Sequence, residues 1–232
     1  MKSGLCFREH AIVRCDAILF DLDGVLADAK PTVERLWSRF AARHRLDVRA
    51  LLADLHGRRM VDTIRVALPD LAPEGLAREI RLMEDEEVEV SSSVDAMSGA
   101  IELTLALSGV SWAVATSCTP SVAQARIRAA GLPQPPVLVT ADDVERGKPA
   151  PDPYLLAARR LGVAPEACVV VEDAPAGLHA GRAAGAVTIA VTTSFPRSAL
   201  PPADFVVASV AELRVASCVP RVTLQLPGGS GS

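Results

Sequence analysis

The sequence has no excess of positive charge, because 24 lysine and arginine residues stand against 28 aspartate and glutamate residues, a formal net charge of −4. Such a chain has no electrostatic basis for non-specific nucleic-acid binding, although local positive charge could still bind small anionic substrates. It also lacks any apolar run approaching the ~20 residues of a membrane-spanning helix, and its start, MKSGLCFREH, lacks the apolar run of a signal peptide. We therefore expect a soluble cytoplasmic protein with no nucleic-acid or membrane partner.

Cysteine is scarce as well, and the five cysteines include no CxxC pair. An odd number without paired spacing favours neither a disulfide framework nor a zinc site. What the chain does have is 50% hydrophobic content over 232 residues. That content suffices for one large domain, or for a core with a smaller insert.

Short apolar segments that end in polar residues recur along the chain, and Ala-rich helical stretches separate them. The apolar segments are 16–20, 112–115, 137–139 and 168–171, and the helical stretches are 121–130, 153–161 and 176–184. Alternation of this kind predicts an α/β fold with a Rossmann-like parallel sheet. Ligands of such sheets bind beyond the carboxyl ends of the strands.

The segment 31–90 interrupts this rhythm with charged, helix-periodic sequence and almost no strand signal. We interpret it as an inserted α-helical cap, with domain boundaries at 29–94 for the cap and at 1–28 plus 95–232 for the core. The charged run EDEEVEV at 84–90 is interpreted as a solvated helix face without chemistry. The residues after Leu213 carry no functional signal.

The first apolar segment leads into the run DLDGVLAD, which holds Asp21 and Asp23 two residues apart. One carboxylate at this spacing can attack an electrophile while the other handles a proton. Gly24 permits a tight exit from the strand and is counted among the substrate-binding candidates. A polar turn after a strand would use the same residue types, so both interpretations stay open for this motif alone.

Thr116 and Ser117 end the second apolar segment, where a hydroxyl and backbone N–H groups could hold a phosphoryl oxygen. The alternative is that they only cap the following helix, with Cys118 as a bystander. Lys148 lies in GKPAPDPY, where the prolines stiffen the loop that presents its cation. Its expected role is to neutralise phosphoryl oxygens and a nucleophilic carboxylate, although most isolated lysines are simply solvated.

Glu172 and Asp173 follow the apolar run CVVV. Two adjacent carboxylates at the ligand-binding edge repel each other unless a cation lies between them, and Mg²⁺ is the natural candidate. The alternative is a carboxylate pair that caps the next helix.

Together and in this order, DLDGV, VATSC, GKPAPDPY and VVVEDAPAG resemble the motifs of the haloacid dehalogenase superfamily, from about Ala17 to Leu213. The helical insert is similar to the cap of that superfamily. Val25 stands where members of that superfamily often have a threonine, which is a mild departure from their pattern. The resemblance implies an Mg²⁺-dependent enzyme with these roles: Asp21 as nucleophile, Asp23 as general acid and base, Thr116 and Lys148 as phosphate ligands, and Asp21, the Asp23 backbone carbonyl, Glu172 and Asp173 as metal ligands.

Within the insert, the run HGRR is similar to the caps of sugar- and polyol-phosphate phosphatases. The resemblance implies that His56, Gly57 and Arg58 bind substrate. A solvated turn with two arginines is the alternative.

The resulting prediction is Mg²⁺-dependent hydrolysis of a small phosphomonoester, most simply a sugar or polyol phosphate, through an aspartyl phosphate. A sugar phosphomutase of the β-phosphoglucomutase type and a non-catalytic phosphate-binding module are the alternatives. A phosphonate hydrolase is excluded, because no lysine occurs between Lys30 and Lys148 to form an imine in the cap. The exact substrate and the choice between monomer and homodimer stay open.

Overall fold

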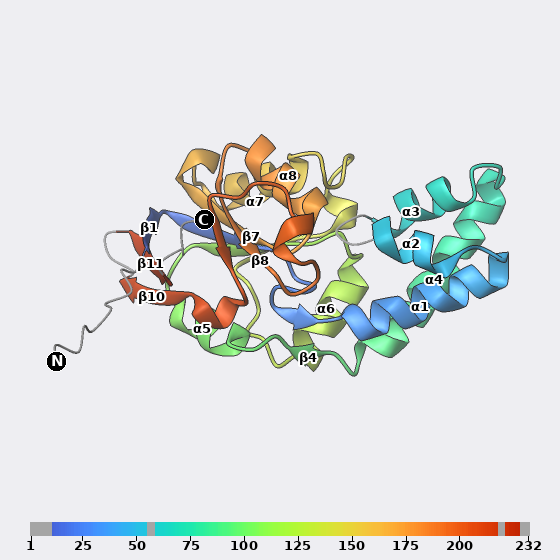
Figure 1. Cartoon of the computed structure of the whole chain (residues 1–232), viewed down its shortest axis with the longest axis horizontal. Helices are drawn as coiled ribbons and strands as arrows, with labels where there is room; N and C mark the ends of the chain where they lie inside the picture. Colours follow the sequence, from blue (N-terminus) through green and yellow to red (C-terminus); the bar gives the residue numbers. More distant parts are fainter. Residues whose placement is uncertain (1–10, 55–58, 218–220, 228–232) are drawn as a thin grey trace, which may run out of the picture.

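The computed structural model describes residues 11–54, 59–217 and 221–227. A six-stranded parallel sheet with the order β6-β5-β2-β7-β8-β9 forms its centre (Figure 1). Its strands are β2 (Ala17–Phe20), β5 (Trp112–Ala115), β6 (Val137–Val139), β7 (Cys168–Glu172), β8 (Val187–Val191) and β9 (Phe205–Val207). The predicted α/β fold with a parallel sheet is confirmed, and β8 and β9 extend the sheet beyond the four strands expected from sequence.

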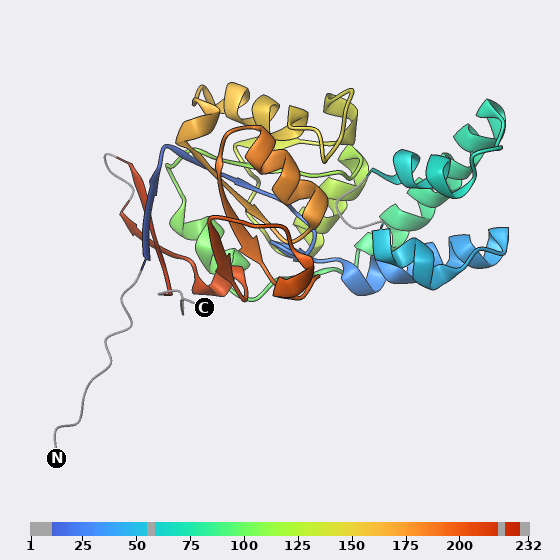
Figure 2. The same ribbon diagram turned by 45° about the horizontal axis from the view of Figure 1, so that its top comes forward.

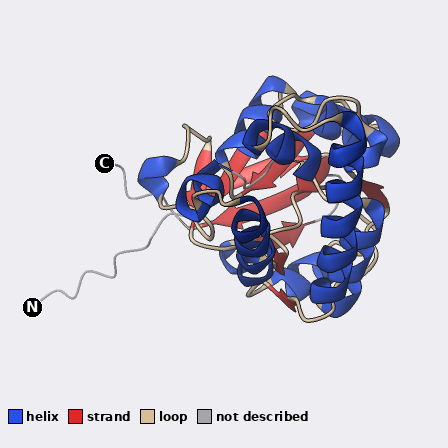
Figure 3. Ribbon diagram, turned by 90° about the vertical axis from the view of Figure 1, so that its right-hand side faces the viewer, coloured by secondary structure: helices blue, strands red, loops and turns tan. Residues whose placement is uncertain are grey.

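The strands are apolar throughout because helices cover both faces of the sheet. On one face, Ile18 and Phe20 of β2 lie in a cluster that includes residues of α5 (Ala100–Ala106) and α6 (Pro120–Ala129). On the other face, Leu19 lies in a second cluster with residues of α7 (Asp152–Leu161) and α8 (Pro175–Ala183). Figure 3 shows the strands enclosed between these helices.

Four helices form a separate layer beyond one end of the sheet (Figure 2). They are α1 (Lys30–His44), α2 (Val48–Asp54), α3 (Met60–Ala67) and α4 (Pro73–Ser91). Leu36, Phe40 and Met83 belong to a small apolar core of their own. The two chain segments that join this layer to the sheet pair as a short antiparallel ladder, β3 (Ala27–Asp28) with β4 (Asp95–Ala96).

A second, antiparallel sheet lies at the opposite end of the molecule (Figure 1). It has the order β1-β11-β10 and consists of β1 (Ala11–Cys15), β10 (Arg214–Ser217) and β11 (Val222–Leu226). Leu224 is fully buried in the main core. The residues after Leu213, which the sequence analysis left without a role, therefore help to close the core.

Short 3-10 helices complete the described elements, at Ala141–Asp143, Pro165–Ala167, Arg197–Ala199 and Val210–Glu212. Within the described ranges, no helix combines the length and apolar character needed to cross a bilayer.

Candidate active site

The site lies where the carboxyl ends of three neighbouring strands meet the helical layer. β2 is the central strand, and it pairs in parallel with β5 on one side and β7 on the other. A cleft of about 290 Å³ opens there and is lined from the sheet by Asp21, Thr116 and Asp173, and from the helical layer by residues such as Trp37. The chain order changes direction across β2, which is the usual position of ligand sites in open α/β sheets.

Lys148 is fully buried behind this cleft and contacts two carboxylates. Its Nζ atom donates to Oδ1 of Asp21 at 2.8 Å and to Oε1 of Glu172 at 2.6 Å. Burial alone would lower the pKa of Lys148, but the charges of Asp21 and Glu172 reverse this effect and raise its pKa. Lys148 is therefore a protonated, doubly anchored cation, as opposed to a solvated surface lysine.

Glu172, the last residue of β7, is satisfied on both of its oxygen atoms. Oε1 also accepts from the Tyr154 hydroxyl at 2.7 Å, while Oε2 accepts from the backbone N–H groups of Asp173 at 3.0 Å and Ala174 at 3.2 Å. A Cβ atom at Gly177 would lie 1.7 Å from Oε1, so the carboxylate packs directly on the backbone of α8. Glu172 thus holds the two N–H groups that precede α8 and also faces the lysine, whereas α8 itself has no side-chain cap hydrogen bond, so the capping alternative is not borne out.

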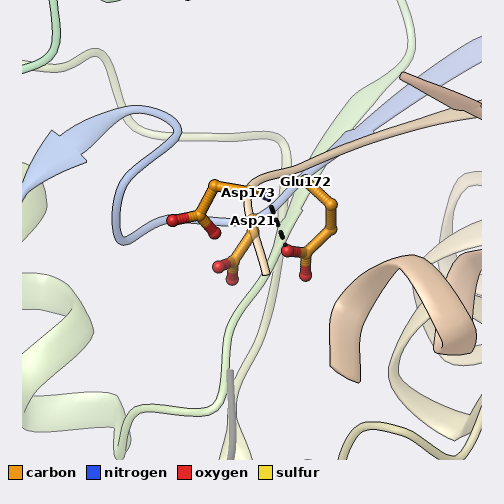
Figure 4. Close-up of side chains that lie close together, drawn as sticks. All are labelled: Asp21, Glu172 and Asp173. Atoms are coloured by element: carbon orange, nitrogen blue, oxygen red, sulfur yellow. Dashed lines mark hydrogen bonds between the residues drawn. The ribbon is translucent and has the colours of Figure 1, made fainter. Parts of the chain in front are cut away.

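Three buried carboxylates converge beside Lys148, those of Asp21, Glu172 and Asp173 (Figure 4). One oxygen atom from each lies within 4.8 Å of the others. Burial raises the pKa of Asp21 to about 7, and Glu172 adds to the effect while Lys148 opposes it. Burial, followed by the charges of Glu172 and Asp21, also raises the pKa of Asp173 well above its usual value.

This carboxylate cluster fits a hard divalent cation. Mg²⁺ prefers oxygen ligands and is commonly bound by one or two carboxylates, waters and a phosphate. A cation at this position would offset the mutual repulsion of the carboxylates, which adds to the effect of burial on the two pKa values. The donor set therefore matches the predicted magnesium site.

Gly24 allows Asp173 to reach its position. Its φ of 76° lies in the left-handed region, and a Cβ atom there would come within 2.0 Å of Oδ2 of Asp173. The Gly24 carbonyl also accepts a hydrogen bond from the Thr193 hydroxyl. Only glycine combines this backbone conformation with so close an approach.

Thr116 and Ser117, at the end of β5, line the same cleft. Thr116 is buried, and its hydroxyl oxygen accepts the N–H of Cys118 at 3.2 Å in the turn that leads to α6. The structure therefore brings together Asp21, Asp23, Gly24, Thr116, Ser117 and Asp173 at the cleft, with Lys148 and Glu172 directly behind it.

Asp23 has partners that the sequence analysis missed. Its Oδ2 atom accepts from the guanidinium of Arg126 and from the Cys118 thiol, the latter at 3.3 Å. Arg126 also donates to Oε1 of Glu87 at 2.5 Å. The interpretation of 84–90 as a purely solvated helix face is wrong at Glu87, which is 9% exposed, and Cys118 is no bystander.

The three substrate-binding candidates His56, Gly57 and Arg58 lie outside the described residues. The next residue, Arg59, is described and connects the helical layer to the core. Its Nη1 atom donates to the Glu145 carbonyl at 2.9 Å, and its Nε atom pairs with Asp62 at 2.7 Å. A Cβ atom at Gly147 would lie 2.8 Å from the Arg59 side chain, so Arg59 packs on the loop just before Lys148.

A parallel α/β core with these strand-end groups and a helical insert defines a class of hydrolases. Residues 15–185 match the haloacid dehalogenase-like hydrolases, and the chain belongs to this family. The resemblance expected from the sequence motifs is thereby confirmed.

Hexitol phosphatase A of Escherichia coli is 44% identical over 205 residues, which are 88% of this chain and 95% of that protein. Glycerol-1-phosphate phosphohydrolase 2 of Saccharomyces cerevisiae is 34% identical over 194 residues, which are 79% of this chain and 77% of that protein. These relatives confirm the predicted enzyme class, a phosphatase.

A solved structure of β-phosphoglucomutase from Clostridium difficile superposes with a TM-score of 0.79 at 21% identity. The match covers 86% of this chain and 93% of that chain. At this level of identity, the likeness concerns the fold.

Proposed function

We propose that this enzyme hydrolyses a small sugar or polyol phosphate, with Asp21 as the nucleophile and Mg²⁺ as the cofactor. The observation that carries the proposal is the buried Lys148, which bonds Asp21 and Glu172 at once beside the carboxylate cluster. The printed names of the two curated relatives, a hexitol phosphatase and a glycerol-1-phosphate phosphohydrolase, support a polyol phosphate as substrate.

In the first step, a carboxylate oxygen of Asp21 attacks the phosphorus atom and the bond to the leaving oxygen breaks. Lys148 fixes the Asp21 carboxylate and offsets negative charge, while Thr116 and Ser117 at the end of β5 hold a phosphoryl oxygen. Bound Mg²⁺ would be held by Asp21, Glu172, Asp173 and the Asp23 carbonyl, and would neutralise charge on the phosphoryl group. The product of this step is an aspartyl phosphate on Asp21.

Asp23 transfers protons in both steps. It first protonates the oxygen of the departing polyol, because an unprotonated alkoxide is a poor leaving group. Asp23 then takes a proton from a water molecule whose oxygen attacks the phosphorus of the aspartyl phosphate. This attack frees inorganic phosphate and returns Asp21 to its starting state.

The helical layer supplies the substrate specificity in this proposal. The cleft of about 290 Å³ is close to the lower end of ordinary ligand pockets and suits a small phosphomonoester. Residues 29–94 act as a cap, and His56, Gly57 and Arg58 are assigned to substrate binding. A polyol can hydrogen-bond to polar groups such as Lys30 and Glu84, which line the cleft.

The test replaces Asp21 by asparagine and measures phosphate release from glycerol and hexitol phosphates with Mg²⁺ present. Loss of the nucleophile is expected to lower the rate by roughly 10⁴-fold or more. Asp28→Asn is the matched control, because Asp28 is exposed in the same segment and should retain the wild-type rate. Wild-type turnover by Asp21→Asn would contradict the assignment, and isomer formation from a hexose phosphate without free phosphate would point to a mutase.

A further inference from the structure

Arg126 is a buried cation that the proposed mechanism does not use. It lies on α6 with no exposed surface, among apolar neighbours of the same helix such as Val122 and Ile127. A guanidinium in such a place requires compensating partners, because removal of a charge from water is costly. Its partners are therefore informative about what the side chain does.

The partners come from two different parts of the molecule. Nη1 of Arg126 donates to Oδ2 of Asp23, which follows β2 in the core, and Nη2 donates at 2.5 Å to Glu87 of α4 in the helical layer. α4 packs directly against α6, so this contact belongs to the junction between the two layers. The planar fork of an arginine fixes the directions of its donors to two carboxylates, whereas the ammonium group of a lysine is a point charge on a flexible stem.

The two oxygen atoms of Asp23 differ in their surroundings. Oδ2 is held by Arg126 and by the Cys118 thiol. Oδ1 is buried and has no hydrogen-bond partner among the residues that the structure describes. Asp23 lines the cleft with a side chain that is 30% exposed, so Arg126 anchors a carboxylate that a proton-transfer partner in the cleft can reach.

We propose that Arg126 is a positioning residue that orients Asp23 for proton transfer, and that Glu87 couples this orientation to the docked position of the helical layer. The inference rests on the proposed role of Asp23. When α4 is docked, Glu87 fixes the far end of the guanidinium, and Arg126 then presents Nη1 to Asp23. Separation of α4 from α6 would release the guanidinium and loosen Asp23, so proton transfer is confined to the closed cleft.

The test compares two substrates that differ in their need for an acid. A glycerol or hexitol phosphate requires protonation of its leaving oxygen, whereas nitrophenolate leaves p-nitrophenyl phosphate without a proton. We expect Arg126→Lys to lower the rate of the first turnover with the polyol phosphate by about 10–100-fold, since general acid catalysis contributes on the order of 10²–10⁴-fold. The rate of the first-turnover burst of nitrophenolate should change by less than about threefold, because this leaving group needs no acid.

Arg128→Lys is the control, because Arg128 is exposed on the same helix and should leave both rates unchanged. Equal losses with the two substrates would indicate general damage to the site and would overturn the inference, as would no loss with either. If the wild-type enzyme released neither polyol nor nitrophenolate, the proposed function itself would be overturned. Failure of the proposed function is thereby distinguished from failure of the inference about Arg126.

A second variant keeps the inference testable if Arg126→Lys does not fold. Glu87→Gln preserves the size of the side chain and should produce a smaller loss, again confined to the polyol phosphate. The double variant should lose no more than Arg126→Lys alone, because both changes act through the same contact. Glu89→Gln is the control, because Glu89 is exposed on the same helix. Additive losses in the double variant would overturn the coupling to Glu87, as would a loss in Glu87→Gln no larger than that in Glu89→Gln.

Discussion

Two charged side chains at the base of the cleft, those of Lys148 and Glu172, are each held by more than one neighbour. Lys148 bonds two carboxylates, and Glu172 is bonded by Lys148, by the Tyr154 hydroxyl and by two backbone N–H groups. Groups fixed in this way need little rearrangement when charge develops on a substrate, which is the physical basis of electrostatic catalysis.

Gly24 offers a test of the metal site at the scale of one residue. Gly24→Ala would place a Cβ atom within 2.0 Å of Asp173 Oδ2 and displace that carboxylate. We expect the affinity for Mg²⁺ to fall by about 10–100-fold, as measured by Mg²⁺ titration of phosphate release. Gly162→Ala is the control, because its φ of 71° is similar but no atom lies within 4 Å of the added Cβ. Equal Mg²⁺ affinities of the two variants would contradict this explanation.

At the scale of elements, the site depends on the strand-end loops and on their contact with the helical layer. The layer meets the core where α4 packs against α6, and the two segments that join it to the core pair as β3 and β4. Arg59, just before α3, adds a contact to the loop that carries Lys148. The position of the layer therefore bears on both the substrate cleft and the catalytic lysine.

Arg59→Ala is expected to weaken this closure. The change removes the hydrogen bond from Nη1 of Arg59 to the Glu145 carbonyl at 2.9 Å, and a charge-assisted bond of this kind is typically worth about 1.5–3 kcal/mol. We expect kcat/KM for the polyol phosphate to fall by about tenfold, since 1.4 kcal/mol corresponds to a factor of ten. Arg65→Ala is the matched control, because Arg65 lies on α3, the helix that follows Arg59, with a side chain that is 62% exposed. Equal kcat/KM values for the two variants in steady-state kinetics would show that Arg59 does not contribute to closure.

At the scale of the whole molecule, the carboxylate cluster links folding stability to pH and to Mg²⁺. Without metal, the folded pKa of Asp21 is about 7, against an ordinary value of 3.8. The folded protein thus binds more protons than the unfolded chain between these values, so this group's contribution to stability is lost as pH rises through that window. Mg²⁺ binds the ionised carboxylates and should offset the loss.

The expected result is a rise in Tm on addition of Mg²⁺ that is larger at about pH 7 than at about pH 5. Thermal unfolding with Mg²⁺ or with a chelator at each pH measures it. Asp21→Asn serves as the comparison, because removal of this titrating group should reduce the pH dependence. A Mg²⁺-induced shift that is the same at both pH values would contradict the linkage.

The sequence by itself determined four strands of the parallel sheet and the groups at their carboxyl ends. β5 and β6 cover the residues predicted, and β2 and β7 each differ by one residue. These strands are continuous apolar runs with polar residues immediately after them. This local pattern can be recognised without knowing which strands pair with each other. Since parallel strands bring their carboxyl ends to one edge, Asp21, Thr116 and Asp173 could be expected to meet.

Tertiary structure alone decided the partners of Asp23. Arg126 is 103 positions from Asp23 and 39 positions from Glu87, and each residue alone has the pattern of an ordinary helix or loop residue. The run VTLQL of β11 does alternate in burial, a signal typical of a strand, but its pairing with β1 lies at the other end of the chain. Burial of a charge and pairing of distant strands depend on how whole elements dock, and local periodicity carries no information about that docking.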